Sequence, residues 1–124
     1  MIVKSIAKNV PISPRKVRTV AALVRGRSVA DALTILEHTP RKSASAVAKT
    51  IKSAQANATN NHDLKGDSLV IDQIFVTTGR KLKRYRPAAH GRALPYQKKQ
   101  TNIYVHVTGE QKAKKPAKSK KEAK

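Results

Sequence analysis

The feature that most constrains the fold of this chain is a basic segment lying between two stretches with the pattern of β-strands. Residues 69–78 (LVIDQIFVTT) are rich in β-branched and aromatic side chains, and residues 101–108 (TNIYVHVT) alternate between apolar and polar positions. The connection at residues 80–95 has 16 residues, six of them basic. Loops of hairpins usually have about 2–5 residues, and much longer ones in a small domain are functional or disordered. We therefore predict an antiparallel strand pair whose basic connection projects from the domain as an arm.

Charge is segregated along the 124 residues, which carry a formal net charge of +20. Residues 1–30 have seven basic and no acidic side chains, residues 31–72 have five of each, and residues 73–109 have eight basic and no acidic ones. Residues 110–124 contain seven Lys and two Glu. A surface charged only for solubility mixes both signs, so this segregation predicts defined contacts with a polyanion. Nucleic acid is the favoured partner and an anionic membrane surface the weaker alternative.

Apolar residues divide the chain into one domain and a tail. All 27 Leu, Ile, Val and Phe residues lie within residues 1–108, and residues 109–124 contain none. A Lys- and Ala-rich segment with nothing to bury stays disordered. We therefore predict a single RNA-binding domain at 1–108, with its hairpin arm at about 76–100, and a disordered tail at 109–124. The chain has no cysteine, which excludes disulfides, Cys-based zinc sites and thiol nucleophiles.

The N-terminal part predicts a short strand followed by a helix. Residues 2–10 alternate loosely, as in a short strand. Ser13 then offers a side-chain acceptor at the N-cap, and Pro14 occupies the first helical position, where its missing N–H costs nothing. The helix is expected to run to about Arg25, with Gly26 just beyond its end. Its apolar stripe and its basic residues fall on different sides, so one face packs and the other remains basic.

Two more helices are predicted in the electrically neutral middle of the chain. The second begins at Ser28, where Asp31 completes a capping-box pattern in the position usually held by Glu. The third is expected to begin at Thr39-Pro40, which repeats the signal of the first helix, and to run to Asn61. Alanine dominates its apolar stripe, which indicates close approach to a neighbouring element.

The basic connection at residues 80–95 contains the side chains best suited to bind RNA. Arg pairs bidentately with phosphate and also stacks on flat rings, so an Arg-rich arm suits a crevice lined by RNA. Interleaved tyrosines offer planar faces for bases or riboses. We expect the arm to be unstable as a free hairpin and to be ordered by a polyanion. The candidate RNA-binding residues are Arg15, Lys16, Arg18, Arg25, Arg80, Lys81, Lys83, Arg84, Tyr85, Arg86, His90, Arg92, Lys98 and Lys99.

Signatures of an enzyme are missing from the sequence. The four histidines are scattered without metal-ligand spacing, and no GxGxxG or GxxxxGKS/T motif occurs. We therefore predict no catalytic residue, no metal site and no cofactor. No apolar run approaches the ~20 residues of a membrane span.

Two other classes of protein could also account for a basic chain of this kind. A free, nucleoid-type DNA-binding protein could insert its first helix into a major groove, but that helix lacks Asn and Gln for base reading. A nuclease or RNA-modifying enzyme would need an acid or a nucleophile in the basic region, where residues 73–109 contain no acid.

Three stretches of the chain carry a resemblance to known proteins. They are ISPRKVRTVAALVRGRSVADALTIL at residues 12–36, KTIKSAQANATNN at 49–61, and HGR at 90–92 followed by TNIYVHV. In this order they are specific, and the chain resembles the bacterial type of the L-twenty-two family of large-subunit ribosomal proteins over about residues 5–108. Ala88 stands where the hairpin of this family often carries a basic residue.

The resemblance implies an α+β fold, with three helices packed on a small antiparallel sheet and a long protruding β-hairpin. It also implies a structural, non-enzymatic constituent of the large ribosomal subunit in the cytoplasm, one that binds 23S-type rRNA and supports assembly. The hairpin would line the polypeptide exit tunnel beside the L-four family tunnel protein and contact the nascent polypeptide, with no membrane contact or homo-oligomer expected. Macrolide contact in that region is a further expectation of the family. The residues implied at the tunnel-lining tip are Arg84, Arg86, Pro87, Ala88, Ala89, His90, Gly91 and Arg92.

Overall fold

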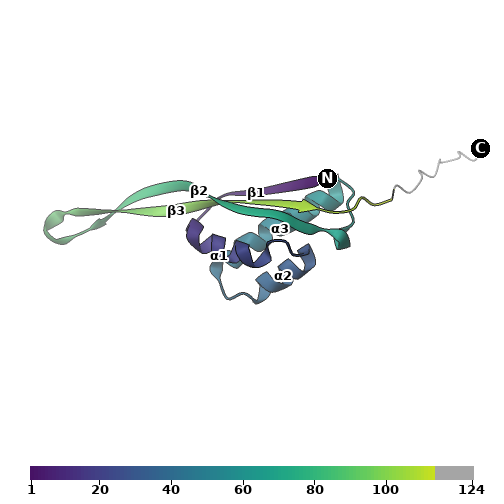
Figure 1. Ribbon diagram of the computed structural model, residues 1–124. Helices are drawn as coiled ribbons and strands as arrows, with labels where there is room; N and C mark the ends of the chain where they lie inside the picture. Colours follow the sequence, from purple (N-terminus) through teal and green to yellow (C-terminus); the bar gives the residue numbers. More distant parts are fainter. Residues whose placement is uncertain (114–124) are drawn as a thin grey trace, which may run out of the picture.

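The computed structural model describes residues 1–113, in which helices cover one side of a sheet and a hairpin extends far beyond both (Figure 1). This arrangement is the expected α+β fold. A short 3-10 turn precedes the second strand, and another lies at the tip of the hairpin. In chain order the elements are β1 (Ile2–Val10), α1 (Pro14–Val24), α2 (Val29–His38), α3 (Lys42–Asn61), β2 (Val70–Pro87) and β3 (Ala93–Thr108).

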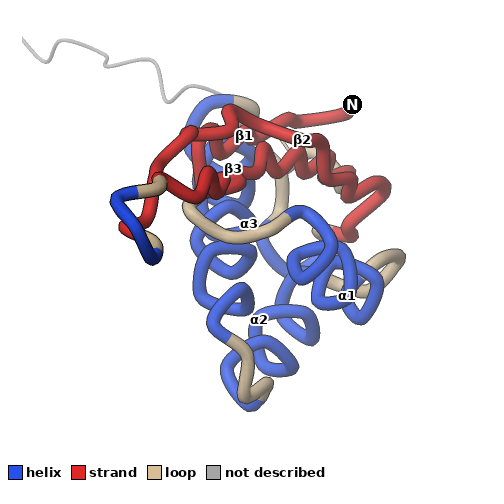
Figure 2. Tube along the Cα trace, turned by 90° about the vertical axis from the view of Figure 1, so that its left-hand side faces the viewer, coloured by secondary structure: helices blue, strands red, loops and turns tan. Residues whose placement is uncertain are grey.

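The sheet is antiparallel, and the C-terminal strand lies at its centre. The strand order is β1-β3-β2, so that β1 and β2 are both edge strands. One row across the sheet aligns Ile6, Tyr104 and Phe75. The α-helices α1, α2 and α3 lie on the same side of the sheet, as the view along the strands shows (Figure 2). Buried and half-buried side chains alternate over residues 101–108 of β3. This alternation follows from the layering, because every second side chain there meets the helices.

The core lies between the helices and the inner face of the sheet. Val17, Val20 and Val24 of α1 are fully or almost fully buried, which confirms the predicted apolar stripe. Burying each such side chain contributes about 1.5–3 kcal/mol relative to leaving it exposed. On α3 the buried stripe includes Ala54 and Ala58, and their small side chains let the helix lie close against β1 and β3.

Helix starts agree with the sequence in two cases out of three. The Ser28 hydroxyl oxygen accepts a hydrogen bond from the Asp31 backbone N–H at 3.3 Å, as the capping pattern predicts. α1 also begins where predicted, at Pro14 with Ser13 as its N-cap, but the Ser13 side chain makes no capping bond, and its carbonyl oxygen accepts from the turn instead. The predicted start of α3 at Thr39-Pro40 is wrong, since α3 begins at Lys42. The Thr39 hydroxyl donates to a carbonyl in the last turn of α2, so this residue closes α2.

The strands of the hairpin run much further than their apolar pattern. The sequence placed the ends of the paired region at residues 78 and 101, but pairing continues to Pro87 opposite Ala93. Beyond the domain neither face of the hairpin is covered, so the backbone ladder persists without any alternation of buried side chains. The connection at 80–95 is therefore mostly strand, which confirms the long protruding β-hairpin implied by the resemblance. It is closed by a turn in which the Ala88 N–H donates to the Arg92 carbonyl at 2.7 Å.

Residues 109–112 contact the domain, although the sequence placed the disordered tail from 109 onward. The Lys65 N–H donates to the Glu110 carbonyl at 2.8 Å, and the Lys112 N–H donates to the Asp63 carbonyl at 2.7 Å. The loop at 63–68 therefore supplies backbone partners to a segment that has no apolar side chain to bury. Residues 114–124 of the predicted tail lie outside the described residues.

Candidate nucleic-acid interface

Basic side chains project from both faces of the hairpin arm. Directly opposed residues of an antiparallel pair point to the same face, and neighbouring pairs point to opposite faces. Lys81 opposes Lys99 on one face, and Arg84 opposes Tyr96 on the other. Every candidate arm residue in the sequence-derived set is exposed, at positions 80, 81, 83–86, 90, 92, 98 and 99. The arm can therefore meet polyanion on two sides at once.

The two arm tyrosines have different surroundings. The guanidinium of Arg86 lies over the ring of Tyr96, with its central carbon 4.9 Å from the ring centroid. This cation–π contact holds Arg86 in place along the arm. Tyr85 is 69% exposed, and it opposes Pro95 on the other face. Tyr85 thus presents a ring for stacking, whereas Tyr96 positions a cation.

A tight left-handed turn forms the tip of the arm. His90 has φ 59° and ψ 36°, and Gly91 follows with φ 70°. The left-handed conformation is open to glycine but uncommon for other residues. Of the residues implied at the tip, Arg84, Arg86 and Pro87 belong to β2, and the others form the turn and its last residue. All of them are exposed except Ala88, which is half-buried.

The first helix meets the root of the arm. Arg15 and Arg18 of α1 line a shallow pocket of about 190 Å³ together with Lys81 and Lys99 of the arm. Thr78 also lines this pocket, and no sequence signal marked it, because only the strand register brings it there. The pocket joins two basic segments that are more than sixty residues apart in the chain. A phosphate group at this point would meet cations from both.

The other two basic residues predicted on the first helix do not join this pocket. Lys16 lines a separate hollow of about 270 Å³ with Arg41 and Lys42. The guanidinium of Arg25, just after α1, donates from Nη2 to the Ile74 carbonyl at 3.0 Å. The candidate set therefore divides into a continuous group at the arm and two outlying positions on the domain.

Among the described residues, no carboxylate lies within 4.0 Å of a basic group of the arm. Among residues 1–113 the ion pair within 4.0 Å is that of Lys65 with Glu110, whose charged atoms lie 3.5 Å apart on the far side of the domain from the tip. An exposed pair of this kind contributes about 0–1 kcal/mol. No acid occurs between residues 73 and 109, so the arm cations have no carboxylate of their own segment to neutralise them.

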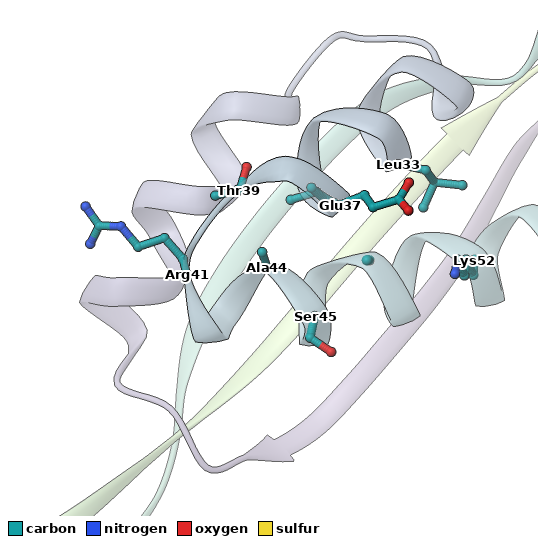
Figure 3. Close-up of a pocket in the computed structure, with 9 residues that line it drawn as sticks. Leu33, Glu37, Thr39, Arg41, Ala44, Ser45 and Lys52 are labelled. Carbon is teal, nitrogen blue, oxygen red and sulfur yellow. The ribbon is translucent and has the colours of Figure 1, made fainter.

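A different kind of pocket, of about 420 Å³, lies between α2 and α3 (Figure 3). It is lined by apolar and oppositely charged side chains, including Leu33, Glu37 and Lys52, while Arg41 extends outward at one end. None of the candidate RNA-binding residues lines it. Within the described chain no cluster of three or more His, Cys, Asp or Glu side chains could hold a metal ion. No helix in the same residues is long and apolar enough to cross a membrane.

Fold and surface together define a class, that of a small α+β protein with a basic hairpin arm suited to structured RNA. Comparison with known proteins makes the class specific. The family model described as "Ribosomal protein L22p/L17e" matches residues 5–108. The chain belongs to this family, and the resemblance drawn from its sequence is confirmed.

Individual relatives agree with the family match. The chain is 49% identical over 108 residues to "Large ribosomal subunit protein uL22" of Oceanobacillus iheyensis, an alignment that covers 87% of this chain and 96% of the relative. It is 48% identical over 108 residues to the protein of the same name from Desulforamulus reducens, with the same coverage. The family is a structural one, so the prediction that the chain is not an enzyme is confirmed. The alternative of a free DNA-binding protein finds no support in these relatives.

Proposed function

We propose that this protein is a structural constituent of the large ribosomal subunit that binds large-subunit rRNA chiefly through its hairpin arm. The observation that carries the proposal is the arm itself, a two-stranded ladder with exposed cations on both faces and no acid in its sequence. Membership of the family and the names of the bacterial relatives support the same particle and a cytoplasmic location.

The arm inserts between segments of the rRNA. Paired residues from Lys81 to Pro87, at about 3.4 Å per residue, carry the tip about 24 Å beyond the root. A two-stranded hairpin without a packed face has marginal stability in water. Phosphates on both sides neutralise its cations, so the arm and the surrounding rRNA order one another during assembly.

The domain end and the tip have separate roles. At the root, Arg15, Arg18, Lys81 and Lys99 bind rRNA phosphates near the surface of the subunit. At the tip, the exposed turn around His90 lines the polypeptide exit tunnel, beside the L-four family protein and in contact with the nascent polypeptide. The tip carries its charge on Arg84, Arg86 and Arg92, since Ala88 supplies none.

Reversing the charge of the arm tests the proposal. We expect the triple variant Arg84→Glu, Arg86→Glu and Arg92→Glu to be largely lost from large subunits, because three attractions to phosphate become repulsions. The measurement is the fraction of tagged protein that sediments with the large subunit in a sucrose gradient. The matched control is Lys8→Glu, Lys49→Glu and Lys52→Glu, which changes the net charge equally on exposed positions outside the candidate RNA-binding set.

Normal incorporation of the arm variant would contradict the proposed role of the arm, and so would an equal loss of the control variant. Density for the tunnel wall in subunits that do incorporate the variant adds a second measurement. An undisturbed hairpin there would contradict the role of these arginines in ordering it.

A further inference from the structure

The helices leave the outer face of the sheet uncovered (Figure 2). This face carries an aromatic cluster. Phe75 of β2 stacks on Tyr104 of β3, with ring centroids 4.8 Å apart and ring planes 8° apart. His106 approaches Phe75 edge-on, with centroids 5.5 Å apart. Tyr104 covers one face of the Phe75 ring, yet Phe75 is 40% exposed. Because β2 is an edge strand, the second face of this ring is directed toward the open side of the sheet.

Arg25 reaches the same edge of the sheet from the helical side. Its Nη2 donates to the carbonyl of Ile74, the residue before Phe75, at 3.0 Å. This bond anchors the guanidinium and uses only part of its fork of N–H donors. Earlier in β2 the edge is closed, because the Ile71 N–H donates to the Arg27 carbonyl at 3.0 Å. The open edge of β2 thus begins near Ile74, whose carbonyl anchors the Arg25 guanidinium and whose next residue in the strand is Phe75.

We propose that Phe75 and Arg25 form a binding site for one unpaired nucleotide of RNA. The base stacks on the outer face of Phe75 and extends the existing stack with Tyr104, and the phosphate of the same or the next nucleotide pairs with Arg25. Stacking of splayed-out bases on aromatic side chains is a common way in which proteins recognise unpaired RNA. The inference rests on the function proposed above and adds a site that holds a base, in contrast to the phosphate contacts of the arm.

Charge favours a nucleotide over an apolar protein segment as the occupant. Residues 1–30 and 73–109 contain no acid, so the parts of the chain that build the site carry no negative charge of their own. Asp72, in the bulge of β2, is the nearest carboxylate along that strand and bounds the site at one end. An apolar partner would cover Phe75 but would leave the guanidinium anchored at the Ile74 carbonyl without a counter-charge.

A single tryptophan can report the stacking directly. The chain contains no Trp, so Phe75→Trp creates a unique fluorophore that keeps a flat ring at the site. The probes are an oligoadenylate of about twelve nucleotides and an oligomer of equal length and charge made entirely of abasic sites. We expect the oligoadenylate to quench the emission and the abasic oligomer to leave it unchanged. Equal quenching of the tryptophan by the two oligomers would overturn the proposal. Binding of both oligomers without any quenching would also overturn it.

Affinity measurements separate this site from the arm. The preference of the full chain for oligoadenylate over the abasic oligomer is expected to fall about 5- to 150-fold in Phe75→Leu, the range for loss of one stacked base. The slope of affinity against salt should stay the same, since no cation is removed. The matched control is Val70→Ala, on the same strand and also 40% exposed, which should retain the preference.

The arm variant with Arg84, Arg86 and Arg92 reversed is expected to bind both oligomers more weakly and to keep the preference. If the unaltered chain binds neither oligomer nor rRNA, the proposed function fails. If it binds both, and Phe75→Leu keeps the preference, only the nucleotide site fails, and the face is left to a protein partner. Ultraviolet cross-linking of the unaltered chain to oligoadenylate needs no variant, and a cross-link on Phe75 or Tyr104 would support the site, whereas cross-links confined to the arm would refute it.

Discussion

At the scale of single residues, Gly79 joins the domain to the arm. It lies in the irregular stretch of β2 where the register shifts between Thr78 and Lys81. A Cβ added to it would lie 3.1 Å from backbone atoms of both Gln100 and Thr101 on the facing strand. Backbone atoms cannot swing aside as a flexible side chain can, so the close approach of the strands depends on glycine at this position.

We expect Gly79→Ala to lower the free energy of unfolding by about 1–3 kcal/mol, because the strands at the root must move apart. Urea denaturation followed by circular dichroism measures the change. Gly66→Ala is the matched control, since its Cβ would meet only a Thr59 methyl group at an ordinary 3.7 Å. The control should remain within about 0.5 kcal/mol of the unaltered chain. Equal stability of both variants would show that the strands at the root tolerate a side chain.

At the scale of elements, β2 and β3 each combine two kinds of strand. Their domain halves alternate between buried and exposed side chains, with Ile71, Ile74, Ile103, Val105 and Val107 buried against the helices. Their arm halves are exposed at nearly every position. The same backbone ladder is thus held by a packed core at one end and by cross-strand pairs alone at the other.

Hydrogen exchange should therefore divide each strand in two. In the free protein we expect amides of residues 81–87 and 93–99 to exchange at least about tenfold faster than those of the buried strand halves. Binding to large-subunit rRNA should slow the arm amides and leave the core amides unchanged. Mass spectrometry of peptides from both halves measures this. Arm amides that are as protected as the core in the free protein would show that the hairpin is stable without RNA.

At the scale of the whole molecule, folding and RNA contact are assigned to different parts of the chain. Every member of the buried apolar core lies outside residues 79–100, and most of the candidate RNA-binding residues lie inside that range. The side chains that stabilise the fold are therefore separate from those proposed to bind RNA.

Removing the arm should leave the domain folded. Thr78 and Thr101 are directly paired, so Asn-Gly in place of residues 79–100 can close a two-residue hairpin turn between them. We expect the free energy of unfolding to change by no more than about 1 kcal/mol, because no core side chain is removed. Affinity for large-subunit rRNA should fall, with a shallower dependence on salt. Thermal unfolding and filter binding measure the two effects, and an unfolded product would mean that the arm contributes to the core.

The sequence by itself determined the segments and their chemistry. Apolar periodicity marked the three helices and the packed halves of the strands, because burial against a core imposes a regular pattern. The segregation of basic from acidic residues along the chain predicted the arm. The motifs around SPRKVR indicated the family. These signals are local, so no knowledge of the fold was needed to recognise them.

Only the tertiary structure decided how far the arm is paired and which distant residues meet. The ladder from Lys81 to Pro87 leaves no trace in the pattern of apolar residues, because neither of its faces is buried. The meeting of Arg15 with Lys99, and of Arg25 with the edge of β2, depends on strand order and on the position of α1 against the sheet. Contacts between residues so far apart in the chain arise from packing, and no local propensity encodes them.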